Sequence, residues 1–98
     1  NFYWASRMIA AMADASYSKS IFHIERYQER VMSKGHEYIN QYDELLAKES
    51  SAEKRMQLRQ EANEKIADMV KKETQDTLNK VLYELSNQMK NAYSRSDA

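Results

Sequence analysis

The residue types that could do chemistry are present in this chain, but their spacing fits no common arrangement. The two histidines, His23 and His36, lie thirteen positions apart. Neither belongs to an HExxH or His-x3-His pattern, which would place two zinc ligands on one helix face. We expect surface or capping histidines, and no metal site.

Paired carboxylates occur at Glu25 with Glu29 and at Asp43 with Glu44. An acid/base pair requires a pocket and shifted pKa values. These pairs fall on charged helix faces, where carboxylates are ordinarily solvated, so we expect them to be exposed.

The usual parts of nucleophilic catalysis are missing. A Ser–His–Asp triad places its serine on a Gly-rich turn, and this chain has one glycine and no cysteine. N-terminal-nucleophile chemistry needs Cys, Ser or Thr at the free end, whereas the first residue is Asn1. The six Met and seven Tyr are expected in a core or interface. The sequence predicts no catalytic, cofactor-binding or metal-binding residue and no cofactor.

Charge and hydropathy narrow the class of partner. Fifteen basic and fifteen acidic residues cancel, so no basic field would attract nucleic acid or anionic lipid. No stretch approaches the roughly 20 apolar residues of a membrane span. We expect no nucleic-acid or membrane partner. The absence of cysteine fits a reducing compartment, and a cytoplasmic location is expected.

The elements that carry these residues are predicted to be helices, because the chain has no proline and a helix-forming composition. We predict an all-α fold with three helices, at about 2–14, 20–48 and 51–93, forming a long helical hairpin or bundle completed by self-association. The first break, Asp14–Ser20, is rich in capping serines (Ser16, Ser18 and Ser20). The second, Lys48–Ser51, contains a capping box formed by Ser50 and Glu53.

Apolar stripes at helical spacing predict the buried faces. Gly35 falls on the stripe of the second helix, where it costs about 1 kcal/mol relative to Ala. Close approach of a neighbouring helix would compensate. The predicted stripes are Ala5, Met8, Ile9 and Met12; then Ile24, Tyr27, Val31, Gly35, Tyr38, Tyr42 and Leu45; then Met56, Ala62, Ile66, Met69 and Val70, continued by Val81, Leu82, Leu85, Met89 and Ala92.

The third stripe is interrupted at KKETQDT, Lys71–Thr77, where Glu73, Thr74 and Thr77 take the inward positions. We predict a bend there or a handover from one packing partner to another. The predicted third helix is also longer than the predicted second helix. Its far end must be covered by the first helix, by a second copy or by a missing part of a longer protein.

The start of the chain suggests a fragment. Asn1 is not an initiator Met, and Phe2, Tyr3 and Trp4 follow it directly. Three aromatic rings seldom stand exposed on a terminus. We expect residues 1–98 to be a single helical fragment from the C-terminal region of a longer protein, which covers these rings.

Three segments together resemble a known family. NFYWASRMIAAMAD at the start, HIERYQERVMSKGHEYINQYD in the middle and KVLYELSNQMKNAYSRSDA at the end are similar to the C-terminal part of the C69 dipeptidases. The resemblance covers most of the chain and is weakest across Leu45–Lys65. It implies a cytoplasmic enzyme that hydrolyses dipeptides with a processed N-terminal cysteine, on a four-layer αββα core.

No residue of this chain matches a catalytic position of that family, so the fragment alone is expected to be inactive. The resemblance implies a structural or assembly role, with the missing N-terminal catalytic domain as partner. Freed from that domain, the fragment should form a homodimer or higher homo-oligomer that hides its apolar stripes. A free-standing helical interaction module of coiled-coil type stays open as the alternative.

Overall fold

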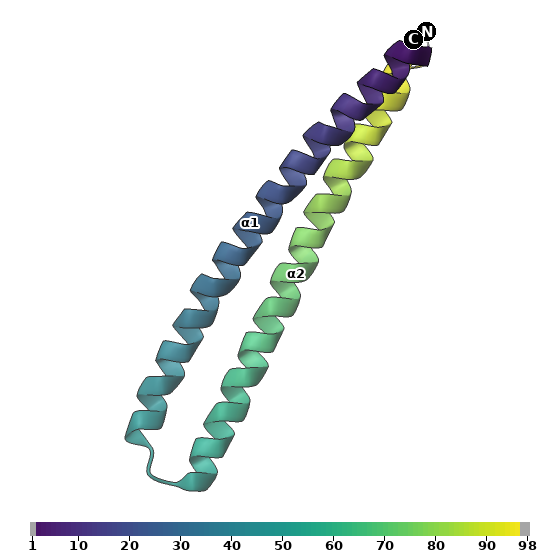
Figure 1. The fold of residues 1–98 in the computed structure, drawn as a ribbon. Coiled ribbons are helices and arrows are strands. Elements are labelled where there is room, and N and C mark those ends of the chain that lie inside the picture. The colour runs from purple at the N-terminus through teal and green to yellow at the C-terminus, as the bar shows by residue number, and fades with distance from the viewer. Residues whose placement is uncertain (1, 97–98) are drawn as a thin grey trace. The chain divides into compact units, whose positions relative to one another are not determined.

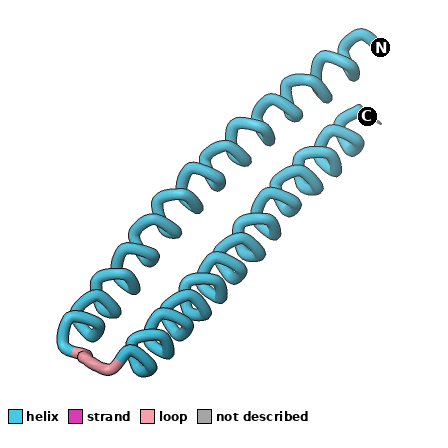
Figure 2. Tube along the Cα trace, turned by 60° about the horizontal axis from the view of Figure 1, so that its bottom comes forward, coloured by secondary structure: helices cyan, strands magenta, loops and turns pink. Residues whose placement is uncertain are grey.

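The chain forms two long helices in a computed structural model that describes residues 2–96. Helix α1 spans Phe2–Lys48 and helix α2 spans Ala52–Ser96 (Figure 1). A short loop joins them (Figure 2). The described residues include no strand, so the all-α prediction is confirmed. The description omits the side chains of Phe2, Met12, Ala13, Ser16, Ala92, Arg95 and Ser96.

The predicted break at Asp14–Ser20 is wrong, because α1 continues through it. Serine disfavours a helix far less than glycine or proline does, and the segment contains neither. Ser20 is 8% exposed and occupies an inward helical position rather than an N-cap. The first two predicted helices are therefore one, and the Ser16 side chain lies outside the described residues.

The predicted break at Lys48–Ser51 is confirmed, but its cap differs from the prediction. Ser51, not Ser50, is the N-cap of α2: its Oγ accepts a hydrogen bond from the Lys54 N–H at 3.4 Å. The Ser51 N–H donates to the Glu49 carboxylate at 3.0 Å. Glu49 thus accepts from the N-cap N–H of Ser51, whereas the predicted capping box would have paired Glu53 with the N–H of Ser50.

Arg55 ties the loop to the end of α1. Its guanidinium donates to the carbonyl oxygens of Leu46 and Glu49, the latter at 3.2 Å. The last carbonyls of a helix have no partner within the helix. Arg55 satisfies two carbonyls at this end from the first turn of α2.

The chain divides into two compact units, each an antiparallel pair of helical segments. The loop unit is Tyr27–Gln75, and the terminal unit combines Asn1–Arg26 with Asp76–Ala98. The first half of α1 therefore packs with the second half of α2. Of the three possibilities considered for covering the far end of the predicted third helix, the structure shows packing by the segment predicted as the first helix.

The inward stripe of each helix, which we call the seam, is mainly apolar in the loop unit, with the buried Glu73 as an exception. Tyr42 and Met69 are its most buried hydrophobic residues, at 5% and 9% exposed. Leu46 replaces the predicted Leu45, which is 49% exposed, and Met56 is 61% exposed. The other predicted seam residues are confirmed as half-buried: Tyr27, Val31, Gly35, Tyr38, Ala62, Ile66 and Val70.

Among the described side chains, the seam of the terminal unit is largely polar. Ser20 and Thr77 are buried, and His23, Glu84 and Gln88 are half-buried beside them. The predictions of Ala5, Met8 and Val81 as inward are confirmed, since each is half-buried. Met12 and Ala92 lie outside the described side chains. The predictions that fail are Ile9, Ile24, Leu82, Leu85 and Met89, which are 37–54% exposed.

Gly35 does not mark a close approach of two backbones. A methyl group added there would lie 4.0 Å from the Met69 Cε, which is ordinary van der Waals contact. No described glycine has a positive φ. The expected compensation is therefore absent, and the helix bears the cost of a mid-helix glycine.

We predict that Gly35→Ala stabilises the chain by up to about 1 kcal/mol, because alanine has the higher helix propensity and fits the space. Thermal unfolding followed by circular dichroism should give a higher midpoint. Ser33→Ala, at an exposed position of the same helix, is the matched control and should gain about 0.5 kcal/mol. A lower midpoint for Gly35→Ala would mean that Met69 cannot yield to the added methyl group.

Candidate functional site

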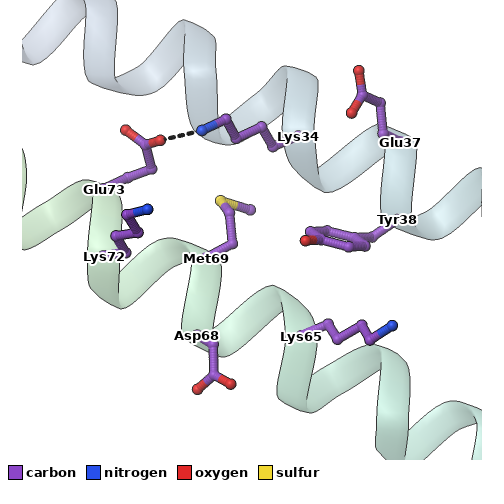
Figure 3. Close-up of a pocket in the computed structure, with 8 residues that line it drawn as sticks. All are labelled: Lys34, Glu37, Tyr38, Lys65, Asp68, Met69, Lys72 and Glu73. Atoms are coloured by element: carbon purple, nitrogen blue, oxygen red, sulfur yellow. Dashed lines mark hydrogen bonds and ion pairs between the residues drawn. The ribbon is translucent and has the colours of Figure 1, made fainter.

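A buried carboxylate on α2 meets two cations of α1 in the loop unit. Glu73 is 6% exposed. Its Oε2 accepts a hydrogen bond from Arg30 Nε at 2.8 Å, and its Oε1 accepts one from Lys34 Nζ at 2.5 Å. Figure 3 shows the Lys34 contact beside Met69. We call Arg30, Lys34 and Glu73 the charge cluster.

Helix periodicity explains how the charge cluster forms. Arg30 and Lys34 are four residues apart, so both project from one face of α1. Glu73 occupies a seam position opposite them. One residue further along α2, the Thr74 Oγ1 lies 2.8 Å from the Tyr27 hydroxyl, which extends the polar contact between the helices.

The charge cluster fixes the protonation state of its carboxylate. Hydrogen bonds lower the pKa of Glu73 to about 2, and the bond from Lys34 has a larger effect than the bond from Arg30. A general acid or base works best with a pKa near the working pH. Glu73 is ionised at neutral pH and is unsuited to that role.

Helix α2 runs without a break through Lys71–Thr77. Both hydrogen-bond partners of Glu73, Arg30 and Lys34, belong to α1. The boundary between the two compact units falls after Gln75, and the predicted bend or handover at this segment stays a prediction. In the sequence Glu73 interrupts the apolar stripe of α2 without a visible partner, because the two cations that pair with it belong to α1. Their signal in the sequence is the pair Arg30 and Lys34, which flank the α1 stripe one turn apart.

A groove of about 510 Å³ adjoins the charge cluster (Figure 3). A hydrogen bond with Tyr42 raises the pKa of Lys65, whereas a nucleophilic lysine needs a lowered one. The lining holds no histidine and no serine or threonine hydroxyl. Basic and acidic side chains alternate along it: Lys34, Glu37, Tyr38, Lys65, Asp68, Met69, Lys72 and Glu73. This arrangement can hold two helices in register, and it offers no bond-breaking machinery.

The residues considered from the sequence are not brought together. His23 is half-buried, with its Nε2 3.6 Å from the Glu84 Oε1 in the terminal unit. His36 lies in the loop unit and is exposed, as are Glu25, Glu29, Asp43 and Glu44. Among the described residues no group of three or more His, Asp or Glu is placed to hold a metal ion. Neither described helix has a segment apolar enough to cross a membrane.

Sequence comparison relates the chain to dipeptidases. It is 42% identical over 98 residues to proteins named "Probable dipeptidase A" from Streptococcus pyogenes, serotypes M1 and M3 (strain SSI-1). It is 30% identical over 134 residues to a "Dipeptidase" from Bifidobacterium longum (strain NCC 2705). Each match takes in 99% of this chain.

The chain spans only part of these relatives: 20% of each streptococcal protein and 25% of the bifidobacterial one. No protein-family profile matches the chain. No solved structure matches it either. The similarity therefore lies in one helical segment of much longer proteins.

We predict that the charge cluster makes folding stability depend on acid pH. The pKa of Glu73 is lowered from 4.5 to about 2 by folding, so between these values the unfolded chain binds the proton more readily. The stabilisation is complete above pH 4.5 and is lost as the pH falls towards 2. Urea unfolding at a series of pH values should show this slope.

Glu73→Gln should flatten that slope. At neutral pH it should also lower the free energy of unfolding by about 1–2 kcal/mol, because the acceptor of both hydrogen bonds loses its negative charge. Glu64→Gln, an exposed position of the same helix, is the control and should keep the slope. An unchanged slope in Glu73→Gln would show that Arg30 and Lys34 do not hold the carboxylate in solution.

Proposed function

We propose that this chain is the C-terminal helical region of a cytoplasmic dipeptidase of the C69 family. Its role is structural or in assembly, and its partner is the rest of that enzyme. The observation that carries the proposal is the 42% identity to a probable dipeptidase along 99% of this chain. The three segments that resemble C69 dipeptidases support the cysteine type.

Dipeptide hydrolysis, under this proposal, belongs to the part of the enzyme outside the chain. The N-terminal cysteine nucleophile that the family resemblance implies has no counterpart in a chain without cysteine. The charge cluster and its groove act in packing and contribute no catalytic group. The helices therefore serve to build the enzyme rather than to bind its substrate.

The test compares the 98-residue chain with the full-length protein encoded by the open reading frame that contains it. The full-length protein should hydrolyse dipeptides, and iodoacetamide should abolish the activity by alkylating the nucleophilic thiolate. The isolated chain should give no turnover above background. Amino-acid release from a panel of dipeptides, followed by chromatography, provides the measurement.

Three outcomes would contradict the proposal in different ways. Turnover by the isolated chain would place the chemistry within these residues. Iodoacetamide-resistant turnover by the full-length protein would contradict the cysteine type. A reading frame that begins close to Asn1 and encodes no activity would favour a free-standing helical module.

A further inference from the structure

The terminal unit has most of its described large apolar side chains on the outside. Ser20 and Thr77 are buried at its seam, with Glu84 half-buried beside them. Burying polar groups between two helices contributes little of the apolar burial that stabilises a fold. Apart from Met8 and Val81, the large apolar residues described in this unit stand outside the seam.

These apolar residues follow the seam on both helices. On α1, Ile21 and Ile24 come directly after the inward residues Ser20 and His23, and Ile9 follows Met8 in the same way. On α2, the exposed leucines and methionine of this unit again each follow an inward residue. The pairs are Thr77 with Leu78, Val81 with Leu82, Glu84 with Leu85, and Gln88 with Met89.

Helix geometry places both sets on one side of the pair. Each residue is rotated by about 100° from the one before it. In an antiparallel pair the two helices run in opposite directions, and their seams also point in opposite directions, towards each other. These two reversals cancel, so the residue after a seam position projects to the same side of the pair from either helix. We call this side the apolar face: Ile9, Tyr17, Ile21, Ile24, Leu78, Leu82, Leu85 and Met89.

The loop unit gives an independent check of this geometry. Ile39 and Asp43 follow the inward Tyr38 and Tyr42 on α1, and Arg59 and Asn63 follow Leu58 and Ala62 on α2. All four residues line a single groove of about 310 Å³. Residues that follow the seam therefore do share one side of an antiparallel pair in this protein.

The apolar face is exposed and carries no charge. Its eight residues are 37–66% exposed, and none is Asp, Glu, Lys, Arg or His. Aromatic residues show the same division between the units. Those of the loop unit, Tyr27, Tyr38 and Tyr42, are buried or half-buried. The described aromatic residues of the terminal unit are all more than half exposed: Tyr3, Trp4, Tyr17, Phe22, Tyr83 and Tyr93.

We propose that the apolar face docks on an apolar surface formed by the rest of the same polypeptide, an inference that rests on the proposed function. The segment takes up 20% of the streptococcal relatives, so about four fifths of such a protein lies outside it. A contiguous exposed apolar surface marks an interaction site. Because the face has no charged residue, a charged surface opposite it would lose its hydration without gaining a partner.

The same polypeptide is a better occupant than a second copy of this chain. A surface joined to the helices by the backbone meets them at an effective concentration in the millimolar range, whereas a second copy must be found in solution. The loop unit has its own apolar seam and a charged exterior, with nineteen of the thirty charged residues in half of the chain. It requires no such cover, so the docking surface is confined to the terminal unit.

Photo-crosslinking can identify the occupant. A benzophenone amino acid replaces Leu82 of the apolar face in the full-length protein, with the same replacement at Met56 as a control. The two side chains are similarly exposed, at 54% and 61%, but Met56 lies in the loop unit. Crosslinked peptides are identified by mass spectrometry, and a second probe at Leu78 covers the case in which the first disturbs folding.

The expected result is crosslinking from position 82 to peptides outside this chain, with none from position 56. Crosslinking from position 82 to the apolar face of a second copy would overturn the proposal in favour of self-association. Equal, solvent-like reaction at both positions would overturn it by showing that the face is uncovered. Dipeptide hydrolysis, measured on the same samples, reports separately on the proposed function.

Discussion

Two helices packed side by side can bury only one stripe each, and the character of that stripe decides how far the pair supports itself. In the loop unit the stripe is mainly apolar, with Tyr42 and Met69 as its most buried hydrophobic residues and Glu73 as its buried charge. In the terminal unit it is largely polar, from Ser20 on one helix to Glu84 on the other. The same antiparallel arrangement thus buries a mainly apolar stripe in one unit and a mainly polar one among the described side chains of the other.

The charge cluster adds specificity to this limited interface. A fully apolar stripe tolerates sliding by one helical turn, because leucine, methionine and valine pack acceptably in several registers. Glu73 has its two hydrogen-bonding cations only when Arg30 and Lys34 lie opposite it. A shifted register would leave a buried carboxylate without partners, which costs more than the pairing itself contributes.

Sequence reasoning gave the helical class, the turn after Lys48 and most of the apolar seam of the loop unit. Those features depend on composition and on contacts that repeat every three or four residues. The break predicted at Asp14–Ser20 is wrong, because weak helix propensity alone does not stop a helix. The prediction that Leu82 and Leu85 are buried is also wrong, because apolar periodicity identifies a face of a helix but not which element packs against it.

The candidate site was predictable only in part. Glu73 was recognised as an inward charge, but its partners come from a helix 39 and 43 residues away in the sequence. The spacing of Arg30 and Lys34 was visible, and what was missing was the register that brings them to Glu73. Register is set by the three-residue turn and the Arg55 contacts, whose geometry the sequence did not reveal.

The Arg55 contacts also bear on how the pair assembles. They join positions only nine and six residues apart, whereas Tyr27 and Thr74 are 47 apart. The entropy lost on closing a loop grows with its length, so contacts beside the turn form at the lowest cost. Each added turn then shortens the chain that the next contact must close. We therefore expect contacts to form first beside the turn and last in the terminal unit.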